Sequence, residues 1–354
     1  MIAYPFRQIL LLCCVVISSA ACAGPGSKTG GEANQGFAGR PEVEVFVQEV
    51  AERNALDADL IRQALAQASY QPRVIKLIQP PAKKGVRSWE RYRSRFLDQT
   101  RISGGLAFWS QYQDSLERAE QVYGVPAEII VSIIGVETLY GRHVGDFETL
   151  SALATLAFDY PPRSALFRRE LEQLFILSGE QGRDPSSYVG SYAGALGYPQ
   201  FLPSSIRHYA VDFDGDGKID LSQSPVDAIG SVANYLRLHG WENGQPVAER
   251  AIVPVHANPA TFVDAGIEPV LQPATLAAAG IVTVTGREAA AISTLVDLET
   301  TGKETEYWFG YRNFYVITRY NRSSFYAMSV FQLADILRIQ RAAMLRAATP
   351  SEKR

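Results

Sequence analysis

Residues 122–145 read VYGVPAEIIVSIIGVETLYGRHVG, and the rest of the chain is best interpreted from this stretch. Eight of the ten residues from Ile129 to Thr138 are apolar, Ser or Gly, and the only charged residue among them is Glu137. Pro126 suits the first position of a helix, and Gly141 is placed to end it. The stretch therefore predicts a buried helix with a single carboxylate near its end.

A carboxylate in such a helix must be paired, neutralised or functional, because burial disfavours the charged form. Burial in apolar surroundings raises the pKa of a carboxyl group, which keeps the acid protonated near neutral pH and able to act as a general acid. In the alternative interpretation Glu137 is structural, and it caps the helix or pairs with Arg142. This stretch alone leaves both interpretations open.

The composition indicates a globular protein of ordinary size. The chain has 354 residues, which corresponds to two domains. Hydrophobic residues make up 47% of the chain, enough for a sizeable core, and the formal net charge is -3. Nothing in that balance suggests nucleic acid as a partner.

The N-terminus has the pattern of an export signal. Arg7 precedes an apolar run from Ile9 to Ile17, and small residues follow, so residues 1–21 are predicted to be a signal peptide. The run is too short to span a bilayer. The chain has three cysteines, and they lie at positions 13, 14 and 22, so the exported chain could form no internal disulfide. Residues 22–40, in which Gly, Pro, Ser, Lys, Asn and Gln together dominate, predict a flexible tether.

Cys22 follows Ser19-Ala20-Ala21 and resembles the acceptor cysteine of a bacterial lipoprotein. Leu is usual where Ser19 stands, so ordinary signal cleavage is the alternative. Ala23, rather than Asp, resembles the outer-membrane form of such lipoproteins. We therefore expect a periplasmic protein of a Gram-negative bacterium, anchored to the outer membrane through lipid on Cys22.

The segment 212–223, DFDGDGKIDLSQ, has the spacing of a calcium loop. Three carboxylates within five residues repel one another unless a cation lies between them. Gln223 stands at position twelve in place of the usual Glu, so Asp227 is the nearest candidate for that ligand. The predicted ligands of a structural Ca²⁺ are Asp212, Asp214, Asp216, the Lys218 carbonyl and Asp227. The alternative is a solvated turn.

The remaining segments divide by their patterns. Residues 41–244 are expected to be helical, and the helices include the segment from Pro225 to Leu238. Residues 245–306 contain short β-like runs and predict a small inserted β domain. Residues 307–346 predict a hairpin, with Glu306–Phe309 and Phe314–Tyr320 on either side of Gly310, followed by a helix that completes the core.

Several of these motifs, in this order, resemble the membrane-bound lytic murein transglycosylase B family over roughly residues 40–345. The matching residues are 135–138, 141–142, 154–156, 194–205, 212–220, 226–235 and 313–326. The resemblance implies a mainly α (α+β) fold: a lysozyme-like helical core, an additional helical domain, a small β domain and an EF-hand-like calcium site.

The resemblance also implies roles for single residues. Glu137 matches the single catalytic acid/base. The positions that match the lining of the glycan groove are Ser191, Gln200, Tyr235, Tyr320, Asn321 and Tyr326. Arg163 matches one of two adjacent arginines near the stem-peptide region, but Pro162 stands where the other would be. Peptide recognition is therefore less well supported than catalysis.

The implied activity is a lytic transglycosylase that cleaves the MurNAc-β-1,4-GlcNAc bond and leaves 1,6-anhydro-MurNAc ends. Two alternatives use the same groove: a hydrolytic muramidase, and a wall-binding protein without activity. The expected partners are peptidoglycan glycan strands and proteins of wall synthesis. We expect a monomer that contacts the membrane only through its lipid anchor and binds no nucleic acid.

Overall fold

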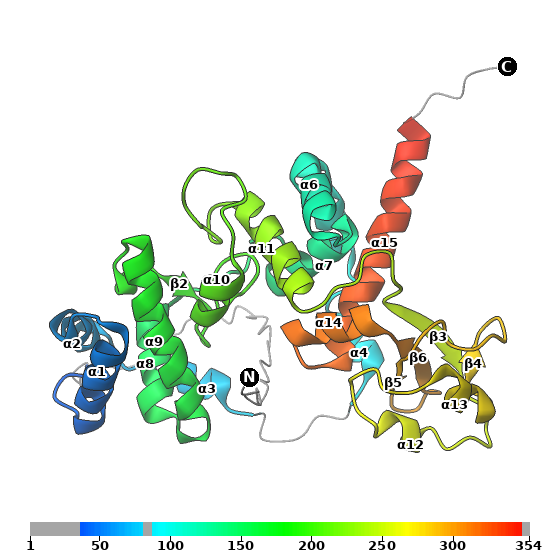
Figure 1. Cartoon of the computed structure of the whole chain (residues 1–354), viewed down its shortest axis with the longest axis horizontal. Helices are drawn as coiled ribbons and strands as arrows, with labels where there is room; N and C mark the ends of the chain where they lie inside the picture. The colour runs from blue at the N-terminus through cyan, green and yellow to red at the C-terminus, as the bar shows by residue number, and fades with distance from the viewer. Residues whose placement is uncertain (1–35, 81–86, 349–354) are drawn as a thin grey trace, which may run out of the picture. The chain divides into compact units, whose positions relative to one another are not determined.

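The computed structural model describes residues 36–80 and 87–348 (Figure 1). The predicted signal peptide, Cys22 and most of the tether lie outside these residues. The chain forms two compact units. Within the described residues, unit 1 comprises residues 87–142 and 225–348, and unit 2 comprises residues 36–80 and 143–224.

Unit 2 is built mainly from helices. Its elements are α1 (Pro41–Asn54), α2 (Ala58–Gln67), α3 (Pro72–Ile78), β1 (Phe147–Glu148), α8 (Thr149–Asp159), α9 (Ser164–Gln181), β2 (Val189–Gly190) and α10 (Pro203–Tyr209), with short 3-10 turns at Pro161–Arg163 and Pro185–Ser187. Helix α8 is buried along almost its whole length and packs against α9. Its apolar sequence, with Thr149 at the first position, explains why this helix forms the centre of the unit.

Buried carboxylates join the helices of unit 2. Glu170 of α9 accepts hydrogen bonds from the Ser204 backbone N–H at 3.0 Å and the Ser204 hydroxyl at 2.8 Å, which fixes the start of α10. Burial raises the pKa of Glu170 above its usual value. Glu172 accepts from Arg53 and Asn54, which ties α1 to α9. Each buried charge is therefore satisfied by named donors.

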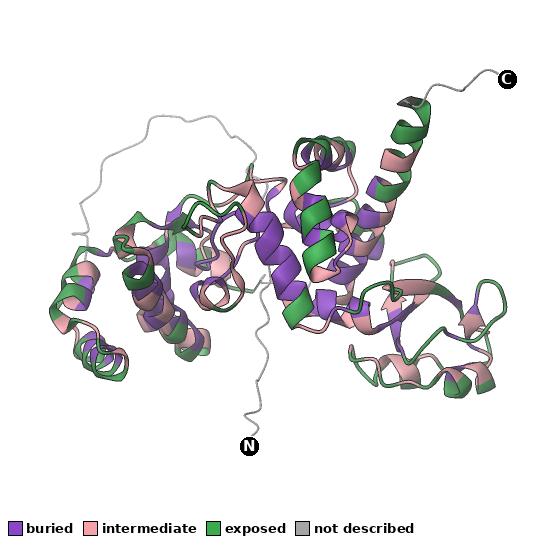
Figure 2. Cartoon of the chain, turned by 45° about the horizontal axis from the view of Figure 1, so that its top comes forward, coloured by how far each residue is buried: buried purple, intermediate pink, exposed green. Residues whose placement is uncertain are grey.

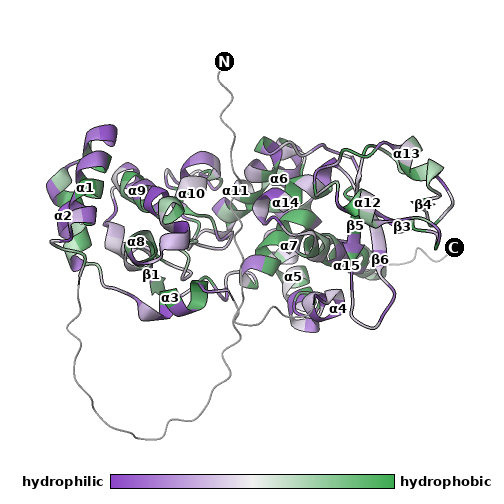
Figure 3. Cartoon of the chain, turned by 90° about the horizontal axis from the view of Figure 1, so that it is seen from below, coloured by the Kyte–Doolittle hydropathy of each residue, from purple (hydrophilic) through white to green (hydrophobic). Residues whose placement is uncertain are grey.

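Unit 1 surrounds helix α7 with other helices. Its helices are α4 (Trp89–Arg93), α5 (Gln99–Gln111), α6 (Gln113–Tyr123), α7 (Ala127–Thr138), α11 (Pro225–Leu238), α14 (Arg312–Tyr320) and α15 (Ser324–Ala348). Helices α5, α6, α11 and α15 all pack on α7. Because apolar residues lie on every side of α7, the helix can only be stable at the centre of such a bundle (Figure 3).

The segment 245–306 contributes three strands of an antiparallel sheet to unit 1. The strands β3 (Ala248–Ile252), β4 (Val282–Thr283), β5 (Thr294–Leu298) and β6 (Glu306–Gly310) are arranged in the order β4-β3-β6-β5. The short helices α12 (Ala260–Val263) and α13 (Pro273–Ala278) accompany the sheet. Leu276, Ile281, Leu295 and Phe309 form the centre of its separate apolar core.

The predicted hairpin around Gly310 is wrong. Glu306–Gly310 is a strand as expected, but residues 314–320 belong to helix α14. The run FYVITRY is rich in β-branched and aromatic residues, which favour strands in isolation. The buried residues, however, are spaced as on one face of a helix, with Phe314, Ile317 and Thr318 facing the interior. Tertiary packing on that face therefore overrides the local preference.

The final helix, α15, begins at Ser324 and ends at Ala348, close to the predicted end at residue 346. The Ser323 hydroxyl accepts the backbone N–H of Tyr326 at 3.3 Å, as a helix cap does. Figure 2 shows that the last turns of α15, beside the C-terminus, are exposed. The expected fold class, a mainly helical protein with a small antiparallel sheet, is confirmed.

In the part of the chain that the structure describes, no single helix has the length and apolar character needed to cross a membrane. Helices α6 and α7 meet that criterion only when taken as a pair, and the pair is bent by 114°.

Candidate active site

Glu137 lies in the last turn of α7, and its side chain is half-buried. The residues on either side of it, Val136 and Thr138, are buried. The predicted buried helix is therefore confirmed, but its carboxylate reaches the edge of the helix bundle. A carboxylate in this position can contact both a protein donor and a bound molecule.

Helix α7 ends earlier than the sequence suggested. Leu139 is the capping residue, with φ of 50°, and its N–H donates to the Gly135 carbonyl at 3.1 Å. Tyr140 follows with φ of 60°, and only then comes Gly141. The prediction that Gly141 ends the helix is wrong, because Leu139 and Tyr140 take the left-handed conformation that capping usually assigns to glycine.

Tyr326, near the start of α15, is the hydrogen-bond partner of Glu137. Its hydroxyl donates to Glu137 Oε1 at 2.5 Å. This distance lies at the short end of the usual range for an O–H···O hydrogen bond. The Tyr326 side chain is 2% exposed, so its ring is fixed by packing before any ligand binds. The arrangement holds one oxygen of the carboxylate in place.

Aromatic rings continue from Tyr326 away from Glu137. The Tyr326 and Tyr320 rings are stacked at 13°, with centroids 6.4 Å apart. The Tyr320 ring lies 4.8 Å from that of Tyr235, whose hydroxyl donates to the Arg319 carbonyl at 2.6 Å. Tyr320 is half-buried, and Asn321 follows it directly with 8% exposure. Tyr326 and Tyr235 are 2% and 8% exposed, so the half-buried Tyr320 is the ring of the three that is most accessible to a bound sugar.

His239 extends this aromatic series, and the sequence analysis missed it. Its ring stacks on Tyr235 at a centroid distance of 4.0 Å. Its Nδ1 lies 2.8 Å from the Tyr235 carbonyl oxygen, to which an Nδ1–H donates. Burial lowers the pKa of His239, so the neutral ring is favoured. The only sequence signal for this contact was the i to i+4 spacing from Tyr235.

Five of the predicted site residues therefore gather in unit 1: Glu137, Tyr235, Tyr320, Asn321 and Tyr326. The other residues predicted to bind substrate belong to unit 2: Ser191 and Gln200 for the glycan, and Arg163 for the stem peptide. Ser191 Oγ accepts the Ala195 N–H at 3.0 Å, within the bent segment after β2. Arg163 ends a short 3-10 turn, and its guanidinium lies 5.3 Å from the centroid of the Phe167 ring.

Gln200, also in unit 2, is held by its own turn. Its backbone has φ of 51°. Its side-chain amide donates to the Val144 carbonyl at 3.1 Å and to the Gly197 carbonyl at 3.0 Å. These contacts hold the amide group in one orientation. They are what a turn glutamine would make, and they are equally compatible with an oriented amide that contacts substrate.

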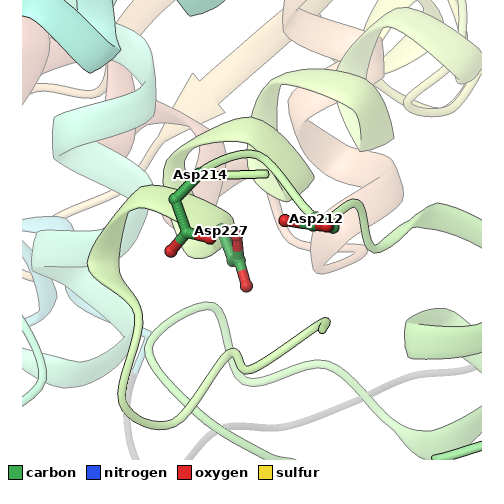
Figure 4. Close-up of side chains that lie close together, drawn as sticks. All are labelled: Asp212, Asp214 and Asp227. Atoms are coloured by element: carbon green, nitrogen blue, oxygen red, sulfur yellow. The ribbon is translucent and has the colours of Figure 1, made fainter. Parts of the chain in front are cut away.

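The calcium-like loop brings carboxylates together. One oxygen from each of Asp212, Asp214 and Asp227 lies within 4.8 Å of the others. Figure 4 shows that two of these side chains come from the loop and the third from the first turn of α11, which follows the loop in the chain. Asp227 is only 1% exposed. A cluster of carboxylate oxygens at this spacing has the donor chemistry that Ca²⁺ requires.

The loop is also shaped by its own aspartates. Asp212 accepts the backbone N–H groups of Gly215 at 2.7 Å and Gly217 at 2.8 Å. Asp214 accepts the Ser224 hydroxyl at 2.6 Å. Asp216 is not in the group of three, and it accepts the Lys218 N–H at 2.8 Å. The loop conformation is therefore set largely by hydrogen bonds between its aspartates and its own backbone.

Known proteins resemble this chain over most of its length. Residues 38–335 match the family model of the transglycosylase SLT domain. Membrane-bound lytic murein transglycosylase B of Escherichia coli (strain K12) is 42% identical over 315 residues, which cover 86% of this chain and 85% of that protein.

Two solved structures share the fold. The Escherichia coli lytic transglycosylase Slt35, solved in complex with calcium, has a TM-score of 0.77 at 42% identity, covering 86% of this chain and 95% of that one. SltB3 from Pseudomonas aeruginosa, solved with NAG-anhNAM-pentapeptide, has a TM-score of 0.75 at 29% identity. The match covers 86% of this chain and 80% of that one. The match to the family model and the identity over most of both chains establish that this chain belongs to the transglycosylase SLT family of lytic transglycosylases.

Proposed function

We propose that the protein cleaves the β-1,4 bond between N-acetylmuramic acid and N-acetylglucosamine in peptidoglycan and forms 1,6-anhydro ends, with Glu137 as its single acid/base. The observation that carries this proposal is the hydrogen bond of 2.5 Å between Tyr326 and the carboxylate at the end of the buried helix α7. The relative at 42% identity is named a lytic murein transglycosylase. SltB3 was solved with a ligand that contains an anhydro sugar.

In the first step Glu137 is protonated and acts as a general acid. Because the Tyr326 hydroxyl donates to Oε1, the proton of the neutral acid sits on Oε2. Oε2 donates this proton to the oxygen that links the two sugars. The bond between that oxygen and the anomeric carbon breaks, and positive charge develops on the carbon.

In the second step the same residue acts as a base. Ordinary glycosidases use a second carboxylate, about 5 to 9.5 Å from the first, to supply a nucleophile or activate water. Here the N-acetyl group of the substrate stabilises the charged carbon. The Glu137 carboxylate takes the proton of the sugar 6-hydroxyl, whose oxygen bonds to the anomeric carbon. Glu137 ends protonated again, and no water is consumed.

The surrounding side chains hold the sugar rather than react with it. The half-buried Tyr320 offers a ring face to the glycan. Tyr235 and Asn321, each 8% exposed, complete the proposed lining of the groove beside it. Ser191 and Gln200 of unit 2 match family positions that line the glycan groove, and we propose glycan binding as their role. Arg163 matches a position near the stem peptide, and we propose peptide binding as its role. Such positioning groups lower the barrier by keeping the reacting bond in line with the acid.

The test is mass spectrometry of the products released when the purified protein digests peptidoglycan sacculi. We expect soluble muropeptides with 1,6-anhydro ends. Muropeptides heavier by one water, with reducing ends, would instead identify a hydrolytic muramidase. If no material is released, the protein is a wall-binding protein, and the proposed activity is wrong.

The loop 212–223, with Asp227, would hold a structural Ca²⁺. The group of three carboxylates supports this site, and a related structure contains calcium. Bound calcium would neutralise the three carboxylates and fix the loop against the start of α11. Asp216 and the Lys218 carbonyl complete the proposed set of ligands.

Removal of calcium is therefore expected to lower the melting temperature. At a calcium concentration about 100 times the dissociation constant, binding stabilises the folded state by about 2.7 kcal/mol. In a protein of this size such a loss lowers the melting temperature by roughly 3 to 4 °C. Thermal unfolding with and without chelator measures the shift. Asp227→Asn should abolish it, while the exposed Asp264→Asn should preserve it; equal melting temperatures for the unmodified protein would exclude a structural calcium site.

Export and anchoring follow from the N-terminal sequence. Residues 1–21 direct the chain to the periplasm, and lipid on Cys22 then holds it at the outer membrane. The name of the Escherichia coli relative includes "membrane-bound". We expect Cys22→Ser to move the protein from the membrane fraction to the soluble periplasmic fraction and to abolish incorporation of labelled palmitate. A variant that stays in the membrane fraction would contradict the lipid anchor.

A further inference from the structure

The backbone directly after Glu137 takes a conformation that is unfavourable for the residues in it. Leu139, Tyr140 and Gly141 have φ values of 50°, 60° and 85°. Only glycine adopts this region without a steric penalty, so two successive residues with side chains must be held there by their surroundings. The contacts that hold them are concentrated on the side chain of Tyr140.

The ring of Tyr140 lies in a slot formed by glycines of two helices. A Cβ atom placed on Gly135 of α7 would lie 2.5 Å from the Tyr140 hydroxyl, and one on Gly105 of α5 would also lie 2.5 Å from it. A Cβ on Gly104 would lie 3.0 Å from the ring carbons. Phe108 packs beside the ring with centroids 5.5 Å apart. The slot therefore fits this ring only because all three positions lack side chains.

The hydroxyl of Tyr140 is anchored to α5. It donates to the Arg101 carbonyl at 2.9 Å. Burial raises the pKa of Tyr140, so the hydroxyl keeps its proton and remains a donor. The chain is thereby attached to α5 three residues after Glu137.

The side chain of Arg101 binds α7 two residues before Glu137, at Gly135. Its Nε donates to the Gly135 carbonyl at 2.9 Å, and its Nη1 donates to the Arg95 carbonyl at 2.6 Å and to Asp98 at 2.5 Å. Arg101 is only 8% exposed. Because a buried arginine loses its hydration, each of these contacts is needed to satisfy it. Gly135 also accepts the N–H of Leu139, so its carbonyl is held by two donors.

We propose that Tyr140 and Arg101 are positioning residues for Glu137. Glu137 lies between two anchored points, Gly135 and Tyr140, and both are attached to Arg101 of α5. This arrangement fixes the last turn of α7, so that the carboxylate meets Tyr326 and the substrate in a single orientation. The inference rests on the proposed role of Glu137 and deepens it. Neither residue is among those proposed to contact the substrate.

The experiment compares Tyr140→Phe with the unmodified protein. The variant keeps the ring in its slot and loses only the hydrogen bond to α5. Because a small misplacement of a catalytic group is costly, kcat should fall about tenfold or more, while KM changes by less than about twofold. Arg101→Lys keeps the charge but loses the paired contacts to Gly135 and Arg95, and it should have the same effect. It serves as the second variant if Tyr140→Phe does not fold.

Tyr311→Phe is the matched control. The Tyr311 hydroxyl is also buried, donates to Glu249 at 2.9 Å and accepts the Ala290 N–H at 3.1 Å, but it belongs to the sheet region. Its loss should affect the melting temperature and leave kcat unchanged. If Tyr140→Phe behaves in the same way as this control, its role is only structural and the proposal is wrong.

A double-mutant cycle with Tyr326→Phe tests whether Tyr140 acts through Glu137. Two substitutions that both release the same carboxylate should together lower kcat by less than the product of their separate effects. Independent, multiplying effects would overturn the proposal. Rates are measured as total muropeptide released, so the cycle can be interpreted whether the products carry anhydro or reducing ends. The masses of those products test the proposed function separately.

Discussion

Replacing Glu137 with glutamine is expected to lower the turnover rate by at least 10²- to 10⁴-fold, the contribution that a general acid or base commonly makes. Glutamine has nearly the same shape and can still accept the hydrogen bond from Tyr326. It can neither donate a proton to the glycosidic oxygen nor remove one from the 6-hydroxyl. Release of soluble muropeptides from sacculi measures the rate, and co-sedimentation with sacculi should show that binding is retained.

Glu128→Gln is the matched control for this prediction. Glu128 lies in the first turn of the same helix, and burial raises its pKa, yet it is at the opposite end of α7 from Glu137. The control variant should keep near-normal activity. Full activity of Glu137→Gln would contradict the single acid/base mechanism. An equal loss of activity in both variants would show that the substitutions had damaged the helix rather than the proton transfer.

Tyr326→Phe is expected to lower kcat by about tenfold to a hundredfold, because a hydrogen bond to a charged group contributes about 1.5 to 3 kcal/mol. The substitution keeps the ring and its stacking on Tyr320, and it removes the donor that holds Glu137 Oε1. Without this donor the proton of the neutral acid is no longer confined to Oε2. Steady-state rates on soluble glycan strands measure the effect.

The half-buried Tyr315 of α14 supplies a control for the loss of a tyrosine hydroxyl in the same region. Tyr315→Phe should change kcat by less than about twofold, since loss of a hydroxyl that is not part of the proposed site has a small effect. A Tyr326→Phe enzyme with the same kcat as this control would show that the 2.5 Å hydrogen bond has no part in catalysis.

Local sequence patterns predicted those features that depend on neighbouring residues. The apolar run before Glu137 predicted helix α7, and the sequence also predicted helices at α11 and at the end of the core. The same approach failed at residues 314–320, where β-prone residues form α14. It failed there because the helix is stabilised by the interior that it packs on, and that interior is distant in sequence.

The contacts within the site could not be predicted from local patterns either, because the residues that make them are distant in sequence. Tyr326 and Glu137 are 189 positions apart, so no spacing rule could pair them. The resemblance to a family pointed to both residues, but not to the hydrogen bond between them. Arg101 and the glycine slot around Tyr140 gave no signal either, because a glycine within a helix is normally a weakness rather than a sign of close packing.

The long separation between Glu137 and Tyr326 also sets the order of events during synthesis. The chain is made from its N-terminus, so helix α7 and its carboxylate emerge well before the strands of the sheet and the start of α15. A nascent or C-terminally truncated chain has the acid but not the tyrosine that orients it. A lytic transglycosylase of this architecture therefore completes its reactive centre only after the start of α15 has been made and folded.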